Sequence, residues 1–420
     1  MAVKGDTGLK RRGRSVSDDG RRREKPENKA GLSVVQGQRK RRGLTVFRVF
    51  ARLAVVSLAI AAGVFIYSRW DKIQPENILL WLNDKLAGGE SGDGFPFEIT
   101  GSSVIGMEST RDGLALLTNN SLVLLNSKGG EIYRRPHGFS KPMMRAGGRW
   151  ILVADSGGNR LRLESRLSTA VEMTVKNKIT SVDVSDRGCF AVATDSTGGY
   201  ASEVAVYRQN SKEPFFHWLD SSFVILDVAI SPDEKSMAVV GVTAQGGGMK
   251  SCLKIFDFDK ESPAAQYEQS DVMLFAVGYF PNGTIAAVGD SAVWVYNKSG
   301  TIRQQHGFDG RRQVGYVIGE SAVSVALSRY GGIEGGTVLT VNSSGDKAYE
   351  TDYEGGFRSM AAHGSDVLVL TSEYLCLIDI TGQKYAGETI KDGRIISVFG
   401  KKAMVLGLSS LVETDFPSKN

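Results

Sequence analysis

The sequence predicts an all-β fold, an eight-bladed β-propeller, behind a disordered basic tail and a single transmembrane helix. Three observations lead to this fold class. The stretch from Val46 to Tyr67 is the one segment that is apolar and long enough to leave water. After residue 95 helical periodicity disappears, and short apolar runs alternate with clusters of Gly, Asn, Asp and Ser. These runs recur as a four-strand unit, which predicts a propeller over residues 95–416.

Residues 1–45 are expected to be a disordered tail. The first 43 residues hold 14 Lys and Arg against 5 acids, a net charge of +9, with almost no aromatic residue. Such a segment buries too little apolar surface to offset the entropy of ordering. Because the basic runs at 21–23 and 39–42 precede an apolar helix, we interpret them as attracted to anionic lipid and not to nucleic acid.

Residues 46–67 are predicted to span a membrane, since 22 helical residues extend about 33 Å and a bilayer core is roughly 30 Å thick. Arg48 and Arg52 share one face near the first end, where their guanidinium groups reach the headgroups. A buried globular helix and a cleaved signal peptide are the competing interpretations. The long leader and the sequence Tyr67-Ser68-Arg69-Trp70 disfavour cleavage.

The charge distribution predicts the orientation of this helix. The basic tail should stay in the cytoplasm, which places the remainder of the chain outside the cell, as a single-pass protein of the cell membrane. Subtracting the tail and the arginines at 48, 52 and 69 from the formal +5 leaves −7 for residues 71–420. The modest total charge therefore conceals two opposite halves.

Residues 68–94 are predicted to form a juxtamembrane amphipathic helix followed by a Gly-rich linker. Ile78, Leu79, Trp81 and Leu82 give the helix an apolar side, and residues 88–94 read Gly-Gly-Glu-Ser-Gly-Asp-Gly. The apolar side either lies on the outer leaflet or packs beneath the folded domain. The sequence leaves both arrangements open.

The repeat is recognised by its turns and its spacing. Similar Asn/Asp-x-x-Gly turns end the third strand of four units, at residues 126–129, 297–300, 342–345 and 379–382. The gaps between first strands are 35 to 50 residues, the repeat length of propeller blades. The first strands start near Val104, Met144, Ile179, Ile225, Phe275, Tyr316, Ser359 and Ser397.

The eighth unit, residues 394–416, has only three strands, whereas residues 95–100 form an orphan strand at the other end. Pairing the two would close the ring and remove an open edge. We therefore expect eight blades, with seven as the competing count if an irregular unit has been split. An outermost strand at 95–100 also means that the chain enters on the face opposite the inter-blade loops.

The turns at Ser231-Pro232-Asp233 and Phe280-Pro281-Asn282-Gly283 resemble those of WD40-like and quinoprotein-like propellers. The Trp-Asp dipeptide of WD40 repeats is absent from the units, and so are the Trp motifs of quinoprotein blades, so the resemblance implies no quinone and no other cofactor. The layout of tail, crossing and divergent propeller is similar to the domain-of-unknown-function family 5711 of Gram-positive membrane proteins. That resemblance implies no activity.

The sequence offers no reaction signature. Cys189, Cys252 and Cys376 each sit inside an apolar strand, which predicts free buried thiols. The four histidines lack metal-ligand spacing, and the Gly-Gly runs do not precede helices. We therefore name no catalytic, cofactor-binding or metal residue and expect a protein that is not an enzyme.

The candidate partner-binding face is made of the inter-blade loops and the loops between second and third strands, which emerge together. Three of these loops share a Gly-Phe step, at Phe139, Phe308 and Phe357, where the phenyl ring is expected to fill the crevice between blades. The surplus of cations suggests an anionic partner. The candidate residues are Arg134, Arg135, His137, Lys141, Lys176, Lys178, Tyr200, His306, Arg311, Arg312, Tyr330, Arg358 and Arg394.

The function expected from these observations is a membrane-tethered, non-enzymatic scaffold or sensor that presents its propeller to a protein or an anionic polymer of the cell envelope. A propeller lyase or hydrolase acting on a cell-wall polymer is the alternative, and signalling across the membrane is a third. A catalytic propeller should cluster ionisable groups with shifted pKa around its axis, whereas a scaffold should present a broad polar rim.

Overall fold

The computed structural model describes residues 52–58, 60–61, 63–64, 92–245, 248–332, 334–390 and 392–418, which fall in two units, Met1–Asn77 and Ile78–Asn420. In the first unit the described residues are helical with exposed side chains. The part of the chain that the structure describes holds no helix long and apolar enough to cross a membrane. The predicted tail lies outside the described residues, as do much of the predicted crossing and nearly all of the juxtamembrane segment.

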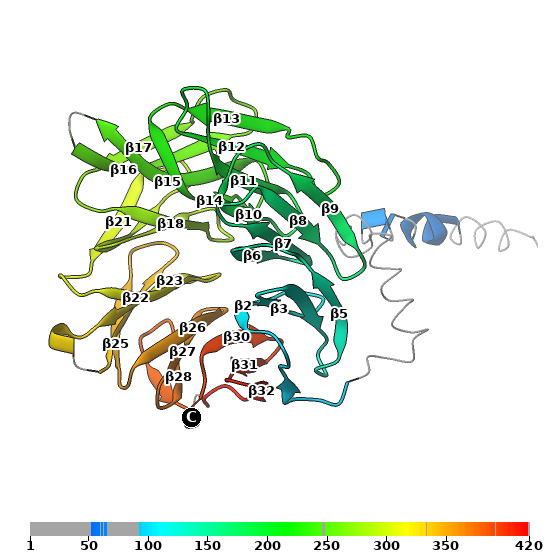
Figure 1. The fold of residues 1–420 in the computed structure, drawn as a ribbon, viewed down its shortest axis with the longest axis vertical. Coiled ribbons are helices and arrows are strands. Elements are labelled where there is room, and N and C mark those ends of the chain that lie inside the picture. The colour runs from blue at the N-terminus through cyan, green and yellow to red at the C-terminus, as the bar shows by residue number, and fades with distance from the viewer. Residues whose placement is uncertain are drawn as a thin grey trace, which may run out of the picture. The chain divides into compact units, whose positions relative to one another are not determined.

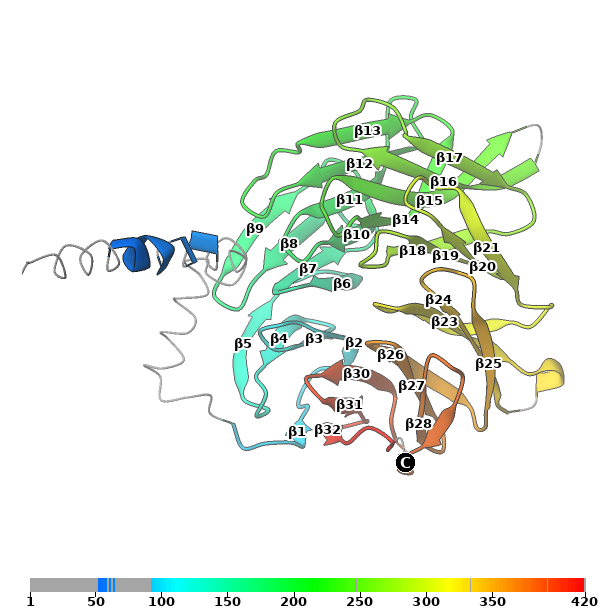
Figure 2. The ribbon, with the colours of Figure 1, turned by 180° about the vertical axis from the view of Figure 1, so that it is seen from behind.

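The second unit consists of eight four-stranded antiparallel sheets, which follow one another around a ring in chain order (Figures 1 and 2). We number them blades 1 to 8 and give the strands of each from the axis outward. The first four blades are β2 (Val104–Ser109), β3 (Leu114–Thr118), β4 (Ser121–Leu125) and β5 (Glu131–Pro136); β6 (Pro142–Gly147), β7 (Trp150–Asp155), β8 (Arg160–Glu164) and β9 (Thr169–Thr174); β10 (Ile179–Val184), β11 (Phe190–Asp195), β12 (Ser202–Tyr207) and β13 (Phe216–Asp220); and β14 (Phe223–Ile230), β15 (Ser236–Gln245), β16 (Gly248–Asp257) and β17 (Ala265–Gln269).

The other four blades complete the ring, and the last of them takes its outermost strand from the start of the domain. A short 3-10 helix, η2 (Tyr330–Gly332), lies within blade 6. These blades are β18 (Leu274–Tyr279), β19 (Ile285–Gly289), β20 (Ala292–Tyr296) and β21 (Ile302–Gly307); β22 (Gln313–Ile318), β23 (Ala322–Ser328), β24 (Gly336–Asn342) and β25 (Ala348–Tyr353); β26 (Phe357–His363), β27 (Asp366–Thr371), β28 (Leu375–Ile378) and β29 (Lys384–Ala386); and β30 (Ile395–Phe399), β31 (Lys402–Leu406), β32 (Ser410–Thr414) and β1 (Phe97–Glu98).

Eight blades, and not seven, are therefore confirmed. Every predicted first strand overlaps an observed one, from β2 in blade 1 to β30 in blade 8. Blade 4 accounts for the longest gap in the repeat, because β15 and β16 have 10 residues each. It is a single extended unit.

The core is divided among the junctions of the ring, because eight clusters of buried apolar side chains each join two neighbouring blades. Both faces of every sheet are thus covered. This explains why β3, β4, β19 and β20 are buried at every residue and read as continuous apolar runs. The expected role of the Gly-Phe loops is confirmed for Phe139 and Phe308, which are buried in clusters between blades.

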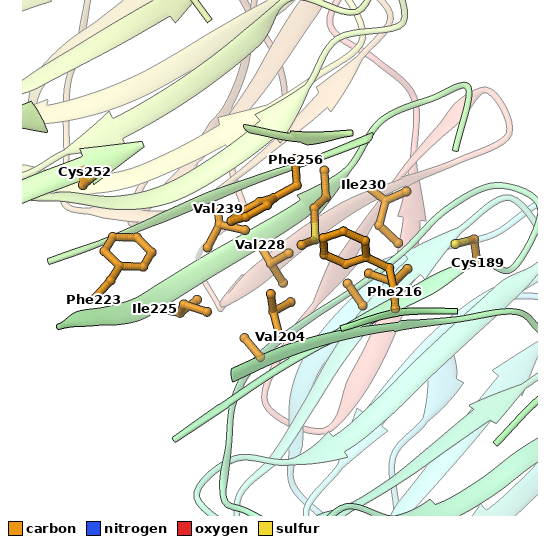
Figure 3. Close-up of a cluster of buried hydrophobic side chains, with 14 residues drawn as sticks. Cys189, Val204, Phe216, Phe223, Ile225, Val228, Ile230, Val239, Cys252 and Phe256 are labelled. Carbon is orange, nitrogen blue, oxygen red and sulfur yellow. The ribbon is translucent and has the colours of Figure 1, made fainter. Parts of the chain in front are cut away.

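The junction of blades 3 and 4 illustrates this packing (Figure 3). Phe216 from β13 and Phe256 from β16 meet edge to face, with ring centroids 5.8 Å apart. Val228 and Val239 of blade 4 and Val204 of blade 3 fill the space around them. Aromatic pairs in this geometry stabilise a junction beyond the area they bury.

The predicted closing strand is confirmed, although only two of its residues pair. Phe97 and Glu98 of β1 lie opposite Leu411 and Ser410 of β32. Phe95, Phe97 and Ile99 pack against the cluster that joins blades 8 and 1. Side-chain burial therefore holds the closure as much as backbone pairing does.

The chain enters the ring where the sequence predicts. The Gly94 N–H donates to the Lys128 carbonyl at 3.0 Å, in the turn between β4 and β5. That turn lies on the face of the ring formed by connections from first to second and from third to fourth strands, which we call the turn face. The inter-blade connections and those from second to third strands lie on the opposite face, which we call the loop face.

The four repeated turns also form as predicted. The side-chain oxygen of Asn126 accepts backbone N–H groups of Lys128 and Gly130, both at 2.8 Å, and Asp379 accepts those of Thr381 and Gln383. The glycine of each turn has a φ of 72° to 84°, a region that side chains rarely adopt. The repetition seen in the sequence is thus a repeated hydrogen-bonding device.

We expect Phe97→Ala to lower the free energy of unfolding by about 2 kcal/mol, because it removes a partly buried ring from the cluster that closes blade 8 on blade 1. Glu98→Ala, on the same strand but exposed, is the matched control and should change stability little. Urea unfolding followed by tryptophan fluorescence measures both. Equal losses in the two variants would contradict the role assigned to the Phe97 ring.

Candidate functional site

The connections on the loop face are fixed by a hydrogen bond that recurs in four blades. A side-chain oxygen at the end of the second strand accepts a backbone N–H from the connection that leads into the same blade. Asp155 accepts the N–H of Lys141 at 2.8 Å, Asp195 that of Lys178 at 2.7 Å, and Asp290 that of Met273 at 3.0 Å. The connections that carry the candidate residues therefore have a fixed backbone, and the three aspartates are partly engaged in fixing it.

Four of the predicted partner-binding residues are engaged within the protein. Arg134 and Arg135 lie in β5 and not in a loop, which corrects the predicted boundary. Arg134 pairs with Glu131 at 2.7 Å, and Arg135 pairs with the buried Glu164 of blade 2 at 2.6 Å while covering the Tyr133 ring. Replacing Arg135 would leave a carboxylate buried without one of its cations, so this arginine joins blades 1 and 2.

Arg311 and His137 are the other two. Arg311 forms two hydrogen bonds to Glu350, at 2.9 and 2.6 Å, and a third to the Phe308 carbonyl. His137 is buried, with one ring nitrogen 3.1 Å from the Thr118 carbonyl and the other accepting the Phe139 N–H. Burial lowers the pKa of His137, so the ring is neutral near pH 7. Both residues therefore make structural contacts within the protein, and their role in partner binding stays a prediction.

The remaining predicted residues are distributed as follows. Tyr200 and Tyr330 are exposed on loops between second and third strands, and the Tyr330 hydroxyl donates to the Asp309 carbonyl. His306 is half-buried beside the Gly345 carbonyl at 3.2 Å. Six cations are exposed and make no ion pair with the described residues: Lys141, Lys176, Lys178, Arg312, Arg358 and Arg394.

The loop face is not uniformly basic, because its charges are sorted by blade. Lys141 lies between blades 1 and 2, and Lys176 and Lys178 lie between blades 2 and 3. We call these three the basic arc. Asp271, Asp290 and Asp309 lie around blade 5, and all three are exposed. Toward blades 6 to 8, the exposed Arg312, Arg358 and Arg394 alternate with the exposed Glu334, Glu373 and Asp392.

A second group of ionisable residues, which sequence reasoning missed, lies on the first strands around the axis. We call Glu108, Arg145, Asp183, Asp227 and Tyr316 the axial cluster. Asp227 accepts the Ser181 hydroxyl at 2.7 Å and the Val277 N–H at 3.0 Å, and lies 3.8 Å from Arg145. Its partners thus come from blades 2, 3 and 5.

The axial carboxylates serve the inner edges of the sheets. A first strand has no neighbouring strand on the side of the axis. Its N–H groups that point toward the axis therefore lack a partner in the sheet. Asp227 satisfies that of Val277, and Asp183 satisfies that of Ile230 at 2.7 Å. These contacts give both aspartates a structural role between neighbouring blades.

Burial near the axis disfavours the charged form of these carboxylates. Burial raises the pKa of Glu108, of Asp183 to about 6, and of Asp227, although Arg145 opposes each shift. A signal for this cluster was present in the sequence, since each of the first four units carries one charged residue within its apolar first strand, at 108, 145, 183 and 227. Only the closed ring shows which of these four residues face one another.

The described residues include cysteines and side chains of the types that can ligate a metal. No group of three or more His, Cys, Asp or Glu that could hold a metal is present in the described part of the chain. The three cysteines are free and buried, as predicted. Burial raises the pKa of Cys189 and Cys376 to about 12 and that of Cys252 to about 11, so all three are inert thiols near neutral pH.

Comparison with known proteins identifies a family and a fold. The model of the family of unknown function DUF5711 matches residues 97–409. The C-terminal WD40 domain of Sif2 is similar, at 14% identity and a TM-score of 0.54, over 78% of this chain and 99% of that one. The β-propeller domain of Cps50 (Swd1) of Myceliophteria thermophila has 11% identity and a TM-score of 0.46, over 66% and 98%. No curated protein matches.

We expect Asp183→Asn to flatten the pH dependence of stability between pH 4 and 6. The pKa of Asp183 is about 6 in the folded state and near 4 in the unfolded state, so the folded state binds the proton first and stability increases as pH falls through this window, by roughly 2 kcal/mol. The asparagine carbonyl still accepts the Ile230 N–H but never ionises.

Urea unfolding at half-unit steps from pH 4 to 7 measures this effect. The variant should be at least as stable as the parent at pH 7, where the parent buries a charge. Asp259→Asn, at an exposed position, is the control and should keep the parent slope. An unchanged slope in Asp183→Asn would contradict the assignment.

Proposed function

We propose that this chain, which belongs to the DUF5711 family of unknown function, is a membrane-anchored propeller that acts as a non-enzymatic scaffold or sensor and binds an anionic partner in the cell envelope. The observation that carries the proposal is the basic arc. Lys141, Lys176 and Lys178 are exposed cations without ion pairs to the described residues, on a segment whose net charge is −7. A local excess of one sign against the charge of the whole domain steers oppositely charged partners.

The rigidity of these loops supports binding. Asp155 and Asp195 fix the backbones of Lys141 and Lys178, and the buried Phe139 anchors the first connection between two blades. A ligand therefore orders only the side chains and not the backbone, which lowers the entropy cost of association. Carboxylate or phosphate groups, from a wall polymer, a lipid headgroup or an acidic protein patch, are the chemistry that three lysines recognise.

The membrane anchor is part of the proposal and rests on the sequence of residues 46–67. The basic tail lies in the cytoplasm, where it contacts anionic lipid, and the propeller is therefore extracytoplasmic. The hydrogen bond of Gly94 to the turn face places the incoming chain opposite the basic arc.

A catalytic propeller acting on a cell-wall polymer is the second candidate, and the axial cluster is the observation that favours it. Ionisable groups with raised pKa gather around the axis, as a catalytic site would require. The scaffold is preferred because Asp183 and Asp227 already accept backbone N–H groups of the next blade. Carboxylates committed in this way hold strands together and are poorly placed to transfer protons.

We expect the combined variant Lys141→Glu/Lys176→Glu/Lys178→Glu to bind polyanions at least tenfold more weakly and with less salt dependence, because it reverses the charge of the arc. Full-length protein in detergent, titrated with fluorescent poly-glutamate and poly(glycerol phosphate), measures both quantities. Arg135 and Arg311 are left intact, since replacing them would disturb ion pairs between strands.

The matched control reverses three exposed lysines of the turn face, Lys235, Lys298 and Lys347, and so produces the same net charge. It should retain most of the binding. Equal losses in the two triple variants would mean that total charge, and not the arc, governs binding, and the proposed site would be withdrawn.

Topology is tested with cysteines introduced into the full chain. The native thiols are buried and should remain silent toward a membrane-impermeant maleimide. In intact cells, Lys235→Cys should be labelled and Ser17→Cys should not, and deletion of residues 46–67 should move the protein out of the carbonate-resistant membrane fraction. Labelling at position 17 together with protection at 235 would reverse the proposed orientation.

A further inference from the structure

Exposed apolar side chains gather on the loop face. Ten large apolar residues are exposed among the described residues of the propeller, and seven of them belong to loop-face connections or to the adjoining ends of strands. Leu167 and Phe215 lie on the turn face, and Tyr316 belongs to the axial cluster. The seven are Ile105, Tyr200, Val224, Met249, Met273, Tyr330 and Leu408.

Three of the seven lie on the loop-face side of blades 4 and 5. Val224 lies at the start of β14, Met249 near the start of β16, and Met273 immediately before β18. Their exposed fractions are 44%, 63% and 44%. We call these three residues the apolar seam.

The pairing register shows that Val224 and Met249 share one face of blade 4. Val224 lies opposite Val242, which lies opposite Ser251, and the pair Ala244 and Met249 is two residues further along the same hairpin. Side chains two residues apart in a strand point to the same face. The Ser251 hydroxyl accepts the Leu274 N–H at 2.8 Å, so this face is turned toward blade 5 and Met273.

The hairpin of blade 4 extends beyond its neighbours. β15 and β16 have 10 residues each, whereas the second and third strands of the other blades have 4 to 7. β14 pairs with β15 only as far as Thr243, and β17 pairs with β16 only from Ser251. Ala244 and Met249 therefore stand beyond both flanking strands, where nothing within the sheet covers them.

The loop-face connections around blade 5, which begin beside Met273, carry three acidic side chains. Asp271, Asp290 and Asp309 are exposed, and the connections that carry them are joined in series. The Ser291 hydroxyl donates to the Asp271 carbonyl at 3.4 Å, and the Phe308 N–H donates to the Ser291 carbonyl at 2.8 Å. Asp290 also caps Met273, and Asp309 lies 3.7 Å from Arg311 with its own side chain 84% exposed.

We infer that the apolar seam and its three bordering aspartates form a docking site for a protein segment that carries apolar side chains next to Lys or Arg. Val224, Met249 and Met273 would receive the apolar side chains, and Met adapts to differently shaped partners because its side chain is unbranched and polarizable. The aspartates would pair with the basic residues at the rim of the contact. This site is distinct from the basic arc and does not depend on it.

Other classes of partner fit this surface less well. Anionic lipid headgroups and anionic polymers would meet three exposed carboxylates of the same sign. Carbohydrate recognition would be expected to use aromatic rings as stacking platforms, whereas the seam consists of one valine and two methionines. Apolar side chains flanked by cations are the chemistry that remains, and a protein segment supplies both.

The test uses a random dodecapeptide library displayed on phage and selected on the full-length chain in detergent. Enriched peptides should combine apolar residues with net positive charge, and synthetic copies should bind at least tenfold more weakly to Val224→Ser/Met249→Ser/Met273→Ser. Asp271→Asn/Asp309→Asn should weaken binding severalfold and reduce its salt dependence. The three seam positions are exposed, so the variants should unfold at the parent temperature.

Leu167→Ser/Leu408→Ser removes two exposed leucines away from the seam and should leave peptide affinity unchanged. The inference is overturned if no peptide is enriched over empty support, if the enriched peptides are acidic, or if this control loses as much affinity as the seam variant. Displacement of the peptides by phosphatidylglycerol vesicles would assign the seam to lipid and would also overturn it. Retained binding by the basic-arc variant would show that the two sites are separate.

Discussion

Burial of both faces of every sheet is the constraint on which this structure depends. A four-stranded sheet with two apolar faces has no stable position alone, and each blade is covered only by the blades before and after it. Because every blade needs a neighbour on each side, blade 8 must also cover the exposed face of blade 1. The chain meets it with a segment from the beginning of the domain, whose Phe95, Phe97 and Ile99 side chains pack where the last and first blades join. Two paired residues suffice because burial contributes the rest.

A ring built in this way has two kinds of exposed edge, and the protein treats them differently. The inner edges face the axis, where Asp183 and Asp227 accept N–H groups that no strand can pair. The cost is visible in their pKa values, which burial raises. Arg145 reduces that cost without removing it, so the axial cluster is a compromise between satisfied backbone and unfavourable charge.

The loop face carries two kinds of cationic residue, those paired within the protein and those exposed to solvent. Arginines that seemed available to a partner, such as Arg135 and Arg311, join neighbouring strands through carboxylates. The lysines of the basic arc are exposed, on connections whose backbones are fixed by capping side chains. Around blades 4 and 5 the same face is apolar and acidic. One face of the ring thus carries two chemically different surfaces.

The sequence by itself determined the repeat, the eight blades and the closing strand, because each rests on local chemistry that every unit repeats. The Asn/Asp-x-x-Gly turns bind their own backbone, and the apolar runs of the middle strands follow from burial on both sides. The buried cysteines were predictable for the same reason. Only the tertiary structure decided which charges are available. Arg135 and Glu164 are 29 residues apart, and Ser181 reaches Asp227 over 46, so the ring alone brings them together. Partners this distant in the chain leave no local pattern. The sequence therefore named the lysines of the basic arc but did not separate them from the paired arginines, and only the closed ring showed which axial residues face one another.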